Sequence, residues 1–351
     1  MRVRRVGVRQ ATRGANVIAP TATLAISVVA SAYADVYYAY ATDHPDDHEL
    51  PAYLFNHTRT EEVNLNLGIL RLEASDDRVR GALALQYGTY VDRNMAAEPQ
   101  ALQYVNEARV GVRAGEEHPV WIDAGVFASH IGFESAIALD CWTLTRSLAA
   151  ENSPYFEAGV KASLAPTDKL DLAFLVLNGW QRIERLDGNH TPSFGSQLAY
   201  KTTSDSLFNW STFVGTDTPD DARAWRVFNN LYWKLDRERY GLIAGLDVGA
   251  QEDLDGGGWD TWYTPQVVAR GKAGPTWIYG RVEYYADPDH VIVAADAPAA
   301  FRTWAGTAGI DVPVIKDAVW RLDVRQFHSD ASNDFLVVTT GLSIRFGGSL
   351  K

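Results

Sequence analysis

Charged side chains recur between apolar residues along much of this chain, and they are its strongest candidates for chemistry. In stretches such as A-R-V-G-V-R-A, residues 108–114, the charges share one face of an extended strand, because successive side chains point to opposite faces. So many ions on one face exclude a dry core, since an unpaired buried charge is costly. The chemistry they offer is sorting of solutes by charge in a water-filled interior. We predict that this interior is lined by Arg80, Arg109, Arg113, Lys161, Arg226, Arg281, Arg321, Arg325, Arg345, Glu157, Glu283 and Asp323.

A second group of candidates lies in the long segment 131–153, which mixes apolar and polar residues. We expect this segment to fold into the interior as a constriction loop. Glu134 and Asp140 would then face the arginine-rich wall and set up a transverse field. The alternative is an external loop that lies over the mouth and uses its apolar residues for packing. Cys141, the only cysteine, is expected to be a packed small side chain.

Other groupings of reactive residues are weak. Residues 43–49, D-H-P-D-D-H-E, could hold a divalent cation, although an acidic loop that contains proline is more often simply hydrated. Adjacent Ser129 and His130 project to opposite faces of a strand, so a nucleophile and its base would need other partners. There is no phosphate loop, dinucleotide fingerprint or zinc signature. We therefore predict no catalytic residues, no metal site and no cofactor.

The elements that must position these residues are strands. About sixteen segments of roughly 8 to 14 residues alternate with period two, and no long helical periodicity competes with them. The last one, residues 335–346, reads F-L-V-V-T-T-G-L-S-I-R-F, with leucine, valine and isoleucine on one face and small, polar or charged residues on most of the other. Its apolar face suits lipid and its other face suits water.

The stretches between strands alternate in length, which is a second signal. Residues 43–60 and 93–105 are long, whereas 75–77 and 115–119 are short, and the alternation mostly persists to the end of the chain. Outer-membrane barrels have short periplasmic turns and longer external loops. An even number of strands would place both termini on the periplasmic side.

These patterns together predict an all-β fold, a transmembrane antiparallel up-and-down β-barrel of about sixteen strands, with 14 or 18 as alternatives. Closure is required because a lipid-exposed edge would leave backbone groups unpaired at several kcal/mol each. Sixteen strands enclose more space than side chains can fill. Tryptophans near strand ends, among them Trp121, Trp259, Trp262, Trp277 and Trp320, suit the two membrane interfaces. A soluble β-sheet protein remains the alternative.

The beginning of the chain indicates export. Five arginines among the first 13 residues precede an apolar run from Val17 to Ala30, and A-Y-A at 32–34 forms a cleavage site. We predict that residues 1–34 are a cleaved signal peptide and that 35–351 form a single barrel domain. Cleavage removes five of 32 basic residues and none of 44 acidic ones, which leaves 27 against 44 and a net charge of −17. Such an acidic chain disfavours nucleic acid as a partner.

The chain resembles the putative β-barrel porin-2, OmpL-like proteins of bacterial outer membranes. The resemblance is carried by D-V-Y-Y-A-Y-A-T at 35–42, V-N-L-N-L-G-I at 63–69, F-A-S-H-I-G-F-E-S at 127–135, N-S-P-Y-F-E-A-G-V-K at 152–161, N-G-W-Q at 178–181 and the closing T-T-G-L-S-I-R-F. It spans nearly the whole mature chain and implies an outer-membrane pore without fixing a substrate. Residues 347–351 depart from it, because they follow the final phenylalanine, at which barrels of this type often stop.

The expected function is therefore an outer-membrane porin of a Gram-negative bacterium, a channel for passive diffusion of small hydrophilic solutes and ions. Its expected partners are outer-membrane lipid, those solutes, the barrel-assembly machinery and, as an open possibility, further copies of the chain in a trimer. An outer-membrane enzyme or adhesin, or a secreted soluble β-sheet binding protein, remains as an alternative.

Overall fold

Sixteen strands follow one another along the described part of the chain, residues 26–350 without 118, 295–299 and 331–332, in a computed structural model. They are β1 (Ser27–Ala41), β2 (Val63–Ser75), β3 (Val79–Tyr87), β4 (Val105–Ala114), β5 (Val120–Ala128), β6 (Phe156–Thr167), β7 (Leu170–Leu177), β8 (Ser193–Thr203), β9 (Ser206–Gly215), β10 (Arg226–Asp236), β11 (Tyr240–Glu252), β12 (Trp259–Ala273), β13 (Thr276–Asp287), β14 (Phe301–Ile315), β15 (Ala318–Ser329) and β16 (Phe335–Leu350). The helices are short: α1 (Thr89–Asn94), α2 (Gln100–Gln103), α3 (Leu148–Glu151), and the 3-10 turns η1 (Ala138–Asp140) and η2 (Asp220–Ala222). None of the helices within the described ranges is long and apolar enough to cross a membrane.

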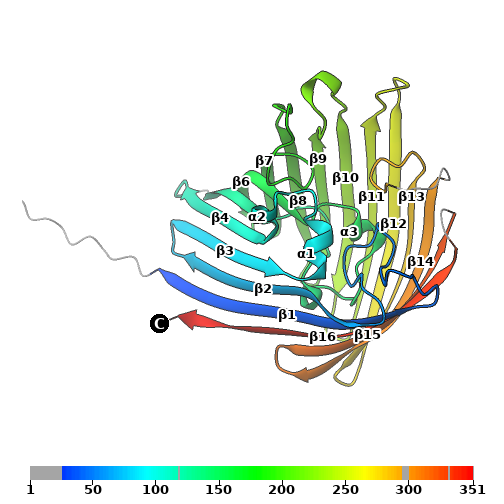
Figure 1. Ribbon diagram of the computed structural model, residues 1–351. Coiled ribbons are helices and arrows are strands. Elements are labelled where there is room, and N and C mark those ends of the chain that lie inside the picture. The colour runs from blue at the N-terminus through cyan, green and yellow to red at the C-terminus, as the bar shows by residue number, and fades with distance from the viewer. Residues whose placement is uncertain (1–25, 118, 295–299, 331–332, 351) are drawn as a thin grey trace, which may run out of the picture.

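Each strand pairs antiparallel with the next, and β1 pairs with β16, so the sheet closes into a barrel. Figure 1 shows the first and last strands side by side, in blue and red. Closure gives every strand two neighbours and leaves no sheet edge. The predicted fold class and the count of sixteen strands are confirmed for the described residues.

Long loops and short turns separate the strands in strict alternation. Residues 42–62, 88–104 and 129–155 connect strands at one end of the barrel, whereas 76–78 and 316–317 connect them at the other. Ser27, the first residue of β1, pairs with Ser75, beside the short turn 76–78. The start of β1 and the end of β16 therefore lie at the short-turn end.

The strand alternation separates an outer apolar face from an inner polar one. On β16, Leu342 and Phe346 are exposed on the outside, while Thr339 and Ser343 are buried on the inside. Outward rings of Tyr263, Tyr284 and Trp304 contact one another across β12, β13 and β14, as expected of an interfacial belt.

The tryptophan prediction needs a correction for three residues. Trp121 lies under the Arg80 guanidinium, Trp277 under Arg270, and Trp262 is 1% exposed within an inner cluster. These rings pack inside the barrel, whereas Trp259 and Trp320 are exposed. Position near a strand end did not decide which face a ring occupies.

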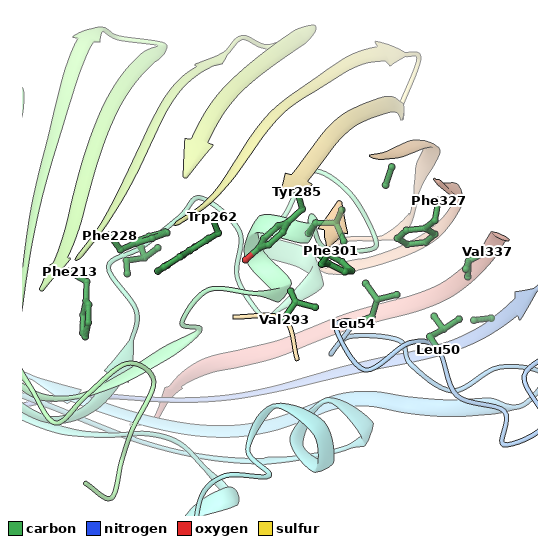
Figure 2. Close-up of a cluster of buried hydrophobic side chains, with 14 of the residues drawn as sticks. Leu50, Leu54, Phe213, Phe228, Trp262, Tyr285, Val293, Phe301, Phe327 and Val337 are labelled. Atoms are coloured by element: carbon green, nitrogen blue, oxygen red, sulfur yellow. The ribbon is translucent and has the colours of Figure 1, made fainter. Parts of the chain in front are cut away.

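Part of the interior is filled by a cluster of buried apolar side chains, shown in Figure 2. Phe213, Phe228, Trp262, Tyr285 and Phe301 belong to β9, β10, β12, β13 and β14. They pack with Leu50 and Leu54 of loop 42–62 and with Val293 of the loop after β13. These two loops therefore fold inward over this side of the barrel.

Strand β1 extends across the predicted cleavage site. Ala30, Ala32 and Ala34 pair with Gly348, Phe346 and Ile344 of β16, and the same stretch pairs with β2. Residues 1–25 of the predicted signal peptide lie outside the described residues. Cleavage after Ala34 remains a prediction, and it would shorten β1 to Asp35–Ala41.

Candidate functional site: a loop that crosses the interior

The crossing loop, residues 129–155 between β5 and β6, contains the segment that the sequence marks as a constriction. Its first turn is fixed by His130, whose Nδ1 lies 2.8 Å from Glu157 Oε1 on β6 and whose Nε2 lies 2.8 Å from the Thr212 carbonyl oxygen on β9. A carbonyl can only accept, so Nε2 donates. Burial opposes the charged imidazole, but the Glu157 carboxylate outweighs it and raises the pKa of His130.

His130 is therefore an anchor and not a general base. Both ring nitrogens are engaged, and neither is left to accept a proton from Ser129. The Ser129 hydroxyl itself donates to Glu157 Oε1 at 3.2 Å.

From this root the loop reaches β13 and β15. Arg281 Nη1 donates to Thr143 Oγ1 at 2.8 Å and to the Thr145 carbonyl at 2.7 Å. The Thr145 amide and hydroxyl both donate to Asp323 Oδ2, at 3.0 and 2.9 Å. Glu283 Oε2 accepts from the Leu148 amide at 2.5 Å. The loop thus crosses from the β5–β6 side to the β13–β15 side, inside the barrel.

The loop is also braced from within. Arg146 is fully buried and donates to the carbonyl oxygens of Ser135 and Ala136, at 2.5 and 3.2 Å. Glu134 accepts from the amide and hydroxyl of Ser147, which caps α3, and lies 3.6 Å from Arg281. Glu134 is thus a brace covered by the loop, and its predicted position opposite an open arginine wall needs correction.

The wall beneath the loop, formed by the inward faces of β13–β15, is called here the covered wall. Arg281, Arg321 and Arg325 face inward as predicted, and so do Glu283 and Asp323, but all five are at most 3% exposed. Arg321 pairs with Asp311 and donates to the Ala138 carbonyl at 2.6 Å, and Glu283 accepts from both Arg281 and Arg325. These residues hold the loop and do not contact water, so the prediction that they line an open pore needs revision. Glu157, bonded to His130, is covered in the same way.

The inward faces of β2–β6 form the open wall. Asp123 lies at its centre and pairs with Arg80 and, at 3.1 Å, with Arg109. Arg71 pairs with Glu107, and Lys161 lies over the Phe127 ring. The side chains of Arg71 and Arg80 remain 32% and 27% exposed, while that of Asp123 is 1% exposed. The guanidinium groups of Arg71 and Arg80 therefore reach water, as does the Glu73 carboxylate that contacts Arg71, whereas the Asp123 carboxylate does not.

Cavities lie along this open wall. Arg71, Ile137 and Asp140 line two of them, of about 210 and 280 Å³. Asp140 Oδ1 accepts from Arg345 Nη2 at 2.8 Å, and both side chains are about two-fifths exposed. A further cavity of about 390 Å³ is lined by Arg80, Arg113 and Lys161 towards the short turns. Asp140 of the loop and Arg345 of β16 thus contact each other beside one of these cavities.

Arg226 lies away from this group, and Arg113 lies at its short-turn end. Arg226 stacks near Trp180 and Trp262 and lies 3.7 Å from Asp217. Arg113 is exposed near the short turn, where Nη1 donates to the Asp77 carbonyl at 3.3 Å.

Several functional candidates escaped the sequence interpretation. Arg71, Glu107 and Asp123 belong to the open wall, and they lie two residues from Ile69, Arg109 and Trp121, on the same face of their strands. A longer window along those strands would have found them. Arg146 carried no such signal, because its partners are backbone carbonyls of its own loop.

The other reactive groupings are accounted for by local contacts. Within the described ranges, no group of three or more His, Cys, Asp or Glu residues could hold a metal ion. In the loop 42–62, His44 and His48 lie 2.9 and 3.3 Å from Glu61. Cys141 is buried, its thiol donates to the Ser135 carbonyl at 3.3 Å, and burial raises its pKa. The predicted packing role of Cys141 is confirmed.

Known proteins share this architecture. A family model described as putative beta-barrel porin-2, OmpL-like, matches residues 27–347. Among solved structures, OmpF of Salmonella typhi in complex with daunomycin superposes with a TM-score of 0.63 at 11% identity, covering 92% of this chain and 97% of its own. An anion-selective porin from Comamonas acidovorans gives 0.60 at 12%, covering 92% and 100%. The trimer form of Vibrio cholerae OmpT gives 0.59 at 8%, covering 92% and 99%. At these identities the structures show the fold, and no curated protein sequence matches.

Proposed function

The chain belongs to the putative β-barrel porin-2, OmpL-like family, and from this premise we propose a passive, anion-favouring diffusion channel for small hydrophilic solutes. The path runs between the crossing loop and the open wall, off the barrel axis. The observation that carries the proposal is a set of cavities lined by residues of β1–β8 and β16, among them Arg71, Arg80, Arg113 and Arg345.

The rest of the cross-section supports this placement. The crossing loop fills the space in front of β13–β15, and the aromatic cluster of Figure 2 fills the space at the loop end of β9–β16. Solutes would pass where cationic groups reach water, and anions would be enriched there. The chain's negative total charge acts weakly at this point, because charges farther away than about 8 Å are screened at physiological salt.

We place the constriction of the proposed path in the cavity that Asp140 and Ile137 of the loop line together with Arg71 of β2 and Arg345 of β16. Opposite charges across a narrow passage orient polar solutes and favour small ones. An enzymatic barrel is the rival reading, but His130 has no free ring nitrogen to serve as a base.

The proposal includes an outer-membrane location, with both termini and the short turns facing the periplasm, as short turns do in such barrels. It also includes export with cleavage of residues 1–34. The partners are outer-membrane lipid, the barrel-assembly machinery and further copies of the chain, a trimer being the form in which Vibrio cholerae OmpT is described.

Planar-bilayer recording of the purified barrel tests the proposal. We expect stepwise ohmic conductance and a reversal potential under a KCl gradient that indicates anion preference, with the preference falling as ionic strength rises. Sugars of increasing size should cease to reduce conductance at a sharp limit. A folded barrel that inserts but conducts no ions would contradict the proposed channel.

A further inference from the structure

A buried carboxylate on β11 lacks the partner that its charge requires. Asp247 lies on the inner face, is 3% exposed, and accepts one hydrogen bond, from Asn230 Nδ2 at 2.5 Å. Within the described residues it forms no ion pair, unlike Asp123 or Glu283, which contact arginines. Buried carboxylates are normally paired with a cation or coordinate a metal.

Two unsatisfied oxygens lie beside it on β12. Thr264 is the register partner of Asp247, and Gln266 is two residues further along the same inner face. Both are at least nine-tenths buried, and neither Thr264 Oγ1 nor Gln266 Oε1 has a hydrogen-bond partner among the described residues. A buried acceptor without a donor costs free energy, and a species bound at Gln266 Oε1 would offset that cost.

A small cavity joins Asp247 and Gln266 to the crossing loop. It measures about 10 Å³, and its polar lining residues include Asp247, Gln266, Asn230, Glu134 and Tyr155, beside apolar residues such as Phe133. That volume admits one particle of the size of a water molecule. The charged groups that face it are Asp247 and Glu134, with Arg281 3.6 Å from Glu134 on its far side. The remaining polar lining groups offer oxygens and no further cation.

We propose that this cavity is a binding site for one hard divalent cation of calcium's class, held by carboxylate oxygens of Asp247 and Glu134 and by Gln266 Oε1. Such cations take oxygen ligands from carboxylates, amides and carbonyls, and calcium tolerates irregular geometry. The bound ion would join the crossing loop to β11 and β12, beside its Arg281 anchor on β13. The inference does not depend on the proposed conduction path.

Terbium is a direct probe, because it replaces calcium and is sensitised by a nearby tyrosine such as Tyr155. The intact barrel, purified in detergent and stripped with EDTA, should show saturable terbium luminescence that calcium displaces. A site with few charged ligands predicts a dissociation constant for calcium of about 0.1–1 mM. Saturating calcium should also raise the thermal unfolding midpoint by a few degrees.

Three variants decide the assignment. Asp247→Asn should abolish both the luminescence and the calcium-dependent midpoint shift, and Gln266→Glu, which adds a carboxylate, should tighten calcium binding about tenfold. The matched control is Asp171→Asn on β7, an exposed carboxylate that lines a different cavity, and it should change neither.

The outcomes that overturn the site are equally concrete. Absence of saturable binding in the unmodified barrel would mean that the cavity holds water beside a protonated Asp247. Gln266→Glu would then lower the unfolding midpoint equally with and without calcium. Binding that survives in Asp247→Asn would place the ion elsewhere, and if that variant fails to fold, the other two measurements still decide.

Discussion

The covered wall and the open wall present the same residue type to the barrel interior with opposite results. On β13–β15 the side chains of Arg281, Arg321 and Arg325 are 0–4% exposed, each bonded to carboxylates or to loop carbonyls. On β2 and β3 Arg71 and Arg80 also pair with carboxylates but keep about three-tenths of their surface in water. An inward arginine that a loop covers thus holds the loop in place. An inward arginine that reaches water instead contributes to the electric field in the interior.

The distinction between the two walls would fail if a buried arginine of the covered wall could be replaced without loss of stability. Arg281→Met removes the donors to Glu283, Thr143 and Thr145, and leaves Glu283 and Glu134 short of a buried partner. We expect a loss of about 3–5 kcal/mol in the free energy of unfolding, because breaking one side of a buried ion pair strands the other charge. Urea titration of the barrel in detergent measures it. Arg113→Met, on an exposed arginine, should stay within about 0.5 kcal/mol, and equal losses would refute the distinction.

Ion selectivity should depend more on Arg71 and Arg345, which reach water, than on the buried arginines of the covered wall. Arg71→Gln with Arg345→Gln should move the reversal potential under a salt gradient towards cation preference, at a stability cost of about 1 kcal/mol or less per pair. Arg325→Gln should cost more stability and leave selectivity nearer to that of the parent, since Arg325 is buried against Glu283. The sequence alone predicted that Arg321 and Arg325 line the water-filled interior and help to sort solutes by charge. A larger potential shift from Arg325 than from Arg71 would restore that view.

The pH dependence of stability tests the contacts by which His130 fixes the start of the crossing loop. The folded pKa of His130 lies above the ordinary value of 6.5, because Glu157 and the Thr212 carbonyl favour the charged imidazole. The stabilisation is therefore fully present below about pH 6.5 and is lost as pH rises through the folded pKa. Unfolding midpoints of the parent and of His130→Gln should converge towards high pH. A difference that is constant from pH 5 to 9 would show that folding does not shift the pKa of His130.

The smallest expected effect concerns the seam, the pairing of β1 with β16 between the two walls. N-terminal sequencing of protein extracted from the outer membrane should give Asp35 as the first residue, as the A-Y-A site predicts. The barrel would then keep the β1 pairing from Asp35 to Ala41 with β16. A mature chain that retains Ser27–Ala34 would show instead that the full-length seam, which pairs those residues on both sides, is the functional form.

Local pattern predicted the strands and the face of each charged residue well. Arg345 and Ser343 point inward because alternation is a property of two neighbouring residues. Coverage by the loop could not be predicted in that way. Asp140 accepts a hydrogen bond from Arg345, which is 205 residues away in sequence. Glu134, a carboxylate six residues earlier, accepts instead from Ser147 of its own loop.

The candidate site shows the same limit in its aromatic residues. Trp121 and Trp277 stand where an interfacial ring is expected, yet each lies beneath an inward arginine, Arg80 or Arg270. An inward arginine gives such a ring a cation–π partner inside the barrel. The expectation that a tryptophan near a strand end faces the membrane interface does not take this partner into account.

The pairing of β1 with β16 also governs how the barrel can form. The Ser343 hydroxyl donates to Asp35 Oδ1 at 2.8 Å, between residues 308 positions apart. Contacts so distant in sequence slow folding, because chain entropy is lost before they are made. Until β16 pairs with β1, one edge of β1 keeps unpaired backbone groups. A barrel that is not yet closed is therefore little stabilised by the pairing of its other strands. Substitutions along this seam should therefore lower the rate and yield of assembly more than they shorten the lifetime of a barrel that has already closed.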